Sequence, residues 1–271
     1  MRTRVLGQSG PLVFTFSLFG GLLLVFVLLP LVRLYGSQTL TTMARIAAVA
    51  DVRAAIWLSL KAALLTSIIS GVMGIPLAFL LSRSQFPGKA VMEAIVDLPL
   101  TIPHTVVGIA LLFVFGRTGV IGAPVNALTG LQFWGSLGGI VVAMLFVSAP
   151  YTVNAARVGF EAADVRLEKV ARTLGAGPWA VFCRVTLPLA WRSILTGLML
   201  TFARSVSEFG AVIVLSYYPM TAPVKIYDLF LQFGLGDSSA MAVLFLTVVL
   251  VLFILLRYLA YGGAVLRRPR S

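Results

Sequence analysis

The sequence contains very few of the residues that build metal sites, disulfides and catalytic centres. Among its 271 residues there is one cysteine, Cys183, and one histidine, His104. A single cysteine excludes an intrachain disulfide and a cysteine metal cluster, and a single histidine excludes a multi-histidine metal site within one chain. A membrane-embedded enzyme would need a nucleophile–base pair or a metal constellation, so this scarcity argues against an enzyme.

Charged residues are also scarce, and they are mostly basic. They make up 11% of the chain against 59% hydrophobic residues, and the mean hydropathy is +1.02. Soluble domains carry about 25% charged residues, so the composition predicts a polytopic, all-α membrane protein. The net charge of +12 could indicate nucleic-acid binding, but a positive-inside bias explains it more economically. We therefore expect no nucleic-acid partner.

The nucleotide-binding P-loop motif G-x-x-x-x-G-K-[ST] is missing as well. Its nearest approach is Gly88-Lys89, which has neither the upstream glycine nor the following serine or threonine. Since those residues cradle the phosphates and the Mg²⁺, we expect no ATP or other cofactor to be bound by this chain. Transport driven by ATP would require a separate ATPase chain.

Six apolar runs reach the roughly 20 residues needed to cross a bilayer. They are residues 11–34, 54–81, 95–115, 137–156, 193–215 and 240–261. With the N-terminus inside, the cytoplasmic segments hold most of the basic residues, which predicts that both termini are cytoplasmic. The basic start at Arg2 and Arg4 precedes a run of 5–32, longer than the roughly 7–15 residues of a signal-peptide core. We therefore interpret this run as a retained first span in the plasma membrane of a prokaryote.

The longest polar interruption, the 160–190 segment, predicts two short amphipathic helices. Four residues spaced i, i+3, i+4 and i+7 share one helical face: Leu167, Val170, Ala171 and Leu174. Asp164 is the expected N-cap, and Gly175 is the expected stop. Pro178 suits the first turn of a second helix that must end before Pro188. Such a segment either fits a partner protein or lies as a surface helix in the lipid headgroup layer.

The spacing in this segment resembles the "EAA…G…I-LP" coupling loop of ABC-importer permeases. Gly175 is followed, after nine residues, by Val185-Thr186-Leu187-Pro188. The acid of the family motif is replaced by Lys169, and Glu168 lies one place earlier. The resemblance implies that the loop docks into a cleft of a cytoplasmic ATPase. The residues it implicates are Arg166, Leu167, Val170, Ala171, Arg172, Leu174, Gly175 and Pro188.

The third run opens with two prolines four residues apart, Pro99 and Pro103. They should interrupt the helix, and non-helical backbone at membrane depth survives only against protein or a water-filled cavity. Thr101, His104 and Thr105 would then be polar groups near the opening. The alternative is a proline-kinked helix whose histidine is satisfied by a neighbour.

The fifth run carries two opposite charges, Arg204 and Glu208, with Ser207 between them. At i and i+4 they share one helical face. Each charge alone would cost about 2.5–3.5 kcal/mol at a helix centre on insertion scales, so pairing or access to water is expected. They are pathway candidates together with Thr101, Pro103, His104 and Thr105, either in contact with substrate or as a clamp between helices.

Two stretches, residues 98–111 and 203–228, resemble molybdate and tungstate permeases, and the resemblance covers about 54–228. It implies the type I ABC-importer permease fold in one domain, 1–271, and alternating access. It also implies a homodimer with its path lined by the third and fifth spans, and two copies of a cytoplasmic ABC ATPase holding ATP and Mg²⁺. A separate extracytoplasmic oxyanion-binding protein would select the cargo. A sulfate/thiosulfate permease and a secondary transporter are the alternatives.

Overall fold

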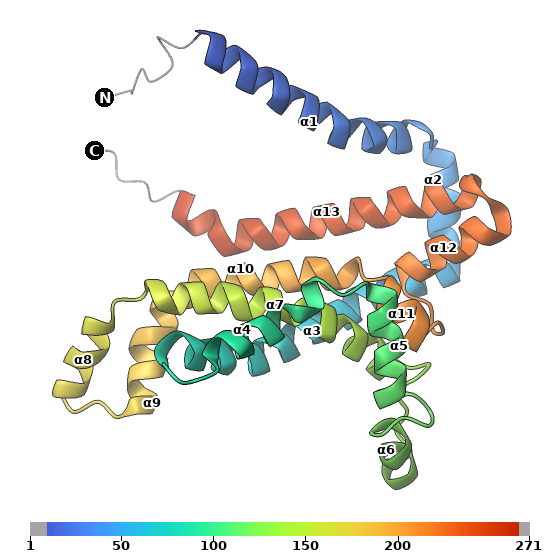
Figure 1. Ribbon diagram of the computed structural model, residues 1–271. Coiled ribbons are helices and arrows are strands. Elements are labelled where there is room, and N and C mark those ends of the chain that lie inside the picture. Colours follow the sequence, from blue (N-terminus) through green and yellow to red (C-terminus); the bar gives the residue numbers. More distant parts are fainter. Residues whose placement is uncertain (1–9, 266–271) are drawn as a thin grey trace.

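The computed structural model describes the backbone of residues 10–265 and the side chains of residues 10–258, and within that range the chain is helical without strands (Figure 1). The elements are α1 (Gly10–Gly36), α2 (Leu40–Ala48), α3 (Ala50–Arg83), α4 (Lys89–Asp97), η1 (Leu98–Leu100), α5 (His104–Phe115), α6 (Gly122–Thr129), α7 (Leu137–Ala162), α8 (Val165–Thr173), α9 (Pro178–Val181), η2 (Phe182–Thr186), α10 (Leu187–Val206), α11 (Gly210–Leu215), α12 (Ala222–Phe233) and α13 (Leu235–Val265).

Within residues 10–265, five helical segments are long and apolar enough to cross a membrane. They are Gly10–Gly36, Ala50–Arg83, Leu137–Ala162, Pro178–Val206 and Leu235–Tyr258. A sixth span results if the pair Lys89–Leu100 and His104–Phe115, bent by 109°, is counted as one. The six spans expected from the sequence are therefore present, and the third is broken at its two prolines, as predicted.

Helices α3, α7 and α10 pack side by side and form the centre of the molecule (Figure 1). Their contacts include hydroxyl pairs as well as apolar side chains. Thr152 on α7 and Thr201 on α10 lie 2.6 Å apart through their hydroxyls, and Ser148 and Ser205 lie 2.7 Å apart. Small hydroxylated residues allow close approach of membrane helices and bond across them. By contrast, α1 has no buried residue.

The fifth span differs from the sequence expectation at both ends. The helical segment begins at Pro178, within the polar 160–190 segment, and stops at Val206. The chain then breaks and turns before α11 begins at Gly210. The prediction that Arg204 and Glu208 share a continuous helix is therefore wrong, because Glu208 lies beyond the helix end.

The second correction concerns Pro188, before which the short helix was expected to end. The helix does not stop there: α9 continues through the π-helical turn η2 into α10, and Pro188 lies in the first turn of α10. The Leu187 N–H bonds to the Phe182 carbonyl five residues back. A π-turn widens the helix just where a proline removes a donor and would crowd the preceding turn.

Candidate functional site

The first candidate site is α8, whose exposed and buried sides are reversed relative to an ordinary surface helix. Leu167, Val170 and Leu174 are 48%, 55% and 83% exposed. The buried residue of this helix is instead an acid, Glu168, at 6% exposure. Surface helices normally turn their apolar stripe inward. A stripe that points outward, beside a charged residue that points inward, is typical of a surface that is covered by a partner.

The ends of α8 are formed by the residues that the sequence indicated. The Asp164 carboxylate accepts a hydrogen bond of 2.9 Å from the Arg166 N–H, which confirms the predicted N-cap. At the other end Gly175 has φ +86°. The Gly175 N–H donates to the Arg172 carbonyl and the Ala176 N–H to the Ala171 carbonyl, each at 3.0 Å. This pair of bonds is the Schellman motif, which requires a left-handed residue at that position.

The second short helix presents an aromatic surface next to this stripe. Pro178 occupies its first turn, as expected, and Trp179 is 76% exposed. The Trp179 ring stacks on Phe182 with a centroid distance of 5.7 Å. Figure 1 shows α8 and α9 together at one end of the molecule, projecting from the ends of α7 and α10. The site residues predicted in the 160–190 segment therefore lie on one projection, except Pro188, which lies at the start of α10.

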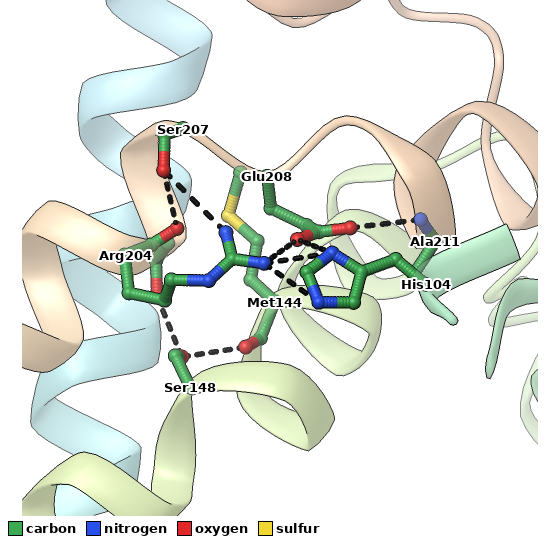
Figure 2. Close-up of polar contacts among 8 residues, drawn as sticks. His104, Met144, Ser148, Arg204, Ser207, Glu208 and Ala211 are labelled. Atoms are coloured by element: carbon green, nitrogen blue, oxygen red, sulfur yellow. Dashed lines mark hydrogen bonds and ion pairs between the residues drawn. The ribbon is translucent and has the colours of Figure 1, made fainter. Parts of the chain in front are cut away.

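The second candidate site is a polar cluster of His104, Arg204 and Glu208 (Figure 2). Arg204 Nη2 lies 2.8 Å from Glu208 Oε2 and 3.0 Å from His104 Nε2. His104 Nδ1 lies 3.1 Å from the same Glu208 oxygen. Arg204 Nη2 also lies 2.7 Å from His104 Nδ1, so the guanidinium faces both ring nitrogens of the imidazole.

Glu208 connects this cluster to α11 as well. Its other oxygen, Oε1, accepts a hydrogen bond of 2.8 Å from the Ala211 N–H, in the first turn of α11. Glu208 is 1% exposed, so its burial depends on these donors. The side chain thus joins the end of α10, the start of α5 and the start of α11, at the points where the third and fifth spans break (Figure 2).

Helices α5 and α11 pack against each other across the direction of the central helices (Figure 1). A Cβ built on Gly210 would lie 2.7 Å from the His104 Cβ, so only glycine permits this approach. The two breaks and the two short helices therefore form one unit, and the polar cluster lies at its base.

Of the other pathway candidates, Ser207 contacts this cluster through Arg204, whereas Thr101, Pro103 and Thr105 lie near it in sequence. Thr101 and Thr105 are exposed, and the Thr101 hydroxyl donates back to the Leu98 carbonyl at 2.9 Å. Pro103 caps α5. The Ser207 hydroxyl donates to the Arg204 carbonyl at 3.0 Å and lies 3.4 Å from Arg204 Nη1. Across residues 10–258, no group of three or more histidine, cysteine, aspartate or glutamate side chains could hold a metal ion.

A third polar centre, which the sequence did not indicate, lies on α12 outside the spans. The Asp228 carboxylate accepts hydrogen bonds from Tyr217 at 2.9 Å, Gln232 at 2.9 Å and Lys225 at 3.2 Å. Burial alone would raise the pKa of Asp228, but the hydrogen bonds from these donors outweigh it and hold the pKa below its ordinary value. The same bond to Asp228 raises the pKa of Tyr217.

The family model and the similar known sequences all point to the same family of transport permeases. Residues 70–262 match the family described as "Binding-protein-dependent transport system inner membrane component". The "Molybdate/tungstate transport system permease protein WtpB" of Thermococcus kodakarensis is 40% identical over 249 residues, which is 91% of this chain and 95% of that protein. The "Molybdenum transport system permease protein ModB" of Escherichia coli K12 is 42% identical over 206 residues, 74% of this chain and 90% of that protein.

Comparison with solved structures gives the same fold. A chain of a bacterial ABC transporter for import of the acidic polysaccharide alginate superposes with a TM-score of 0.76 at 18% identity, covering 93% of this chain and 95% of that chain. A chain of the MetNI methionine ABC transporter superposes with a TM-score of 0.58 at 16% identity, covering 77% and 92%.

Proposed function

The chain belongs to the family of binding-protein-dependent transport system inner membrane components, and we propose that it is the permease subunit of an ATP-driven importer of molybdate and tungstate. The cargo is suggested by relatives with those names that are about 40% identical over most of this chain. No feature of the chain favours sulfate or thiosulfate. The observation that supports the coupling role is the reversed helix α8, with Leu167, Val170 and Leu174 facing outward.

The assembly we propose contains two copies of this chain around a two-fold axis, with the third and fifth spans lining the path. Two cytoplasmic ABC ATPases bind the 160–190 segments and hold the ATP and Mg²⁺, so this chain is not itself an enzyme and binds no cofactor. An extracytoplasmic protein delivers the oxyanion. A neighbour in fold supports this kind of partner: the alginate transporter has been solved in complex with its substrate-bound periplasmic protein.

The orientation in the membrane follows from the same assignment. Figure 1 shows that α1 begins, and α13 ends, at the end of the molecule from which α8 and α9 project. If that projection meets a cytoplasmic ATPase, both termini are cytoplasmic, and α2, α6 and α12 lie on the outer side. The excess of basic residues in the segments assigned to the cytoplasm agrees with this orientation.

Within this assembly we assign the polar cluster a clamping role. Arg204 is already neutralised by Glu208 at 2.8 Å, so the cluster offers no free positive charge to a dianion. A path must also bind its cargo weakly enough to release it. The clamp holds α5 and α11 to the end of α10, so that these elements move together when the path opens and closes.

The test is uptake by the purified complex. This chain would be reconstituted in proteoliposomes with its ATPase, and the binding protein and molybdate would be supplied on the side opposite the ATPase. We expect molybdate uptake that stops when ATP, the ATPase or the binding protein is left out. Uptake that continues in vesicles without an ATPase would indicate a secondary transporter and contradict the proposal. Calorimetry of the binding protein with molybdate, tungstate and sulfate identifies the cargo separately.

A further inference from the structure

The buried acid of α8 is paired with the last residue of α3. Arg83 Nη2 and Nε lie 2.7 and 3.1 Å from the same oxygen, Oε1, of Glu168. The two side chains are 16% and 8% exposed. A pair of this kind, with two charge-assisted hydrogen bonds in a mostly buried place, has a defined geometry that an exposed ion pair does not have.

Arg83 also holds the junction between α7 and α8. Its Nη2 lies 3.3 Å from the carbonyl oxygen of Ala163, the C-cap residue of α7. The guanidinium at the end of α3 therefore contacts two other elements, the end of α7 and the inward side of α8. The three cationic residues of α8, Arg166, Lys169 and Arg172, are exposed.

The end of α3 that carries Arg83 is packed into the centre of the molecule. Ala78 and Leu81 are 0% and 2% exposed, and they share a buried cluster with Phe160 of α7 and Ile194 of α10. Close-packed interiors transmit displacement because they have little free volume. A force applied to Glu168 is therefore applied, through Arg83, to the helices that form the core.

We propose that the Arg83–Glu168 ion pair is the tether that passes movement of the 160–190 segment to α3. The proposal rests on the proposed function, because a segment without a bound ATPase has no such movement to transmit. Glu168 is thus a positioning residue that acts on the inner side of α8, while the apolar stripe on the outer side contacts the ATPase.

The test compares ATP hydrolysis with molybdate uptake in the reconstituted complex. We expect Glu168→Gln and Arg83→Met to bind the ATPase in a pull-down and to hydrolyse ATP. The number of ATP molecules used per molybdate should rise roughly tenfold, which corresponds to about 1.4 kcal/mol of lost coupling. Glu161→Gln is the matched control, since that carboxylate is 49% exposed and lies 4.0 Å from its nearest cation, and its ratio should equal that of the wild type.

Two paired variants keep the test decisive if the single variants fold poorly, because neither leaves an unpaired buried charge. The exchanged pair Arg83→Glu/Glu168→Arg should recover most of the wild-type ratio, whereas the apolar pair Arg83→Met/Glu168→Leu should not. The tether is refuted by a wild-type ratio in Glu168→Gln or in the apolar pair, or by an exchanged pair that couples no better than the apolar one. A wild-type complex without ATP-dependent uptake would refute the proposed function instead.

Discussion

At the scale of single residues, two ion pairs compensate charged side chains that are largely buried. Arg204 and Glu208 lie between two broken spans, and neither is left without a partner. The buried Arg83–Glu168 pair follows the same rule near the 160–190 segment. Buried ion pairs add little net stability compared with apolar packing, but removal of one partner leaves an unpaired buried charge at high cost. Replacing one member of either pair should therefore lower the stability of the protein more than replacing both members.

We predict that Arg204→Met and Glu208→Gln each reduce thermal stability and uptake more than the double variant does. The expected coupling energy is about 1–3 kcal/mol, typical of residues in one hydrogen-bonded network. The measurement is the Tm and the molybdate uptake of the four proteins of the cycle. Effects that add to within about 0.5 kcal/mol would show that the two charges act independently, and would contradict the clamp.

Substitutions at Gly175 can test the effect of backbone conformation and the effect of added charge separately, on the surface that we propose contacts the ATPase. A Cβ at this position meets no atom within 4 Å, so the cost of a side chain comes from φ alone. Asparagine and aspartate tolerate left-handed backbone, whereas a β-branched residue does so poorly. We predict that Gly175→Asn retains most uptake, and that Gly175→Val destabilises the turn by about 1–2 kcal/mol.

Gly175→Asp should insert in the membrane like Gly175→Asn but lose uptake, because it adds a charge to the surface that we propose contacts the ATPase. Membrane levels, pull-down with the ATPase and uptake of the three variants distinguish these outcomes. Equal uptake by the Asn and Asp variants would show that no partner approaches this turn.

Asp228 should make the α12 region sensitive to acid. Its pKa is lowered in the folded protein, so its contribution to stability is complete above the ordinary aspartate pKa of about 3.9 and is lost as the pH falls through the lowered value. We predict a falling Tm below about pH 4, and a lower Tm with a flatter acid limb for Asp228→Asn. If the Tm falls equally steeply with decreasing pH in both proteins, other carboxylates cause the acid sensitivity.

At the scale of elements, the sequence correctly predicted the helix breaks and helix limits that depend on nearby residues. Pro99 and Pro103 indicated the break in the third span, and Asp164 and Gly175 indicated the limits of α8. The six spans and the type I ABC-importer permease fold are confirmed. The helix breaks and limits have local causes, which are a missing N–H at proline, a capping carboxylate and a positive φ.

The sequence did not predict features that depend on contacts between distant segments. The i, i+4 spacing placed Arg204 and Glu208 on one helix, but the chain leaves the helix at Ser207, and the Glu208 carboxylate accepts from the Ala211 N–H in the first turn of α11. The π-turn before Pro188 was also missed, although its cause is local, because the proline was taken as a helix stop. The ion pair between Arg83 and Glu168, which lie 85 positions apart, was also missed. The available signal was weak: Glu168 is the one acid between Val165 and Thr173.

At the scale of the whole molecule, one copy of the chain leaves much apolar surface uncovered. All of α1 is without buried residues, and α5 packs on α11 at one side of the central helices. Six spans make a thin bundle to enclose a path, so this apolar surface is available to lipid and to a second copy. We predict two copies of this chain in the active complex. Native mass spectrometry of the purified assembly measures the number, and an active complex with one copy would contradict the homodimer.

The central claim is that the outward face of α8 couples this permease to a separate ATPase. It is tested most directly by uptake of molybdate through reconstituted complexes that carry Ala171→Asp/Leu174→Asp. The control is Ala171→Ser/Leu174→Met, which changes the same positions without adding charge. We predict that both variants insert at the wild-type level and that only the Asp pair loses ATPase binding or coupling, and with it uptake. Normal uptake by a well-inserted Asp pair would mean that α8 is only a surface helix, and would contradict the account.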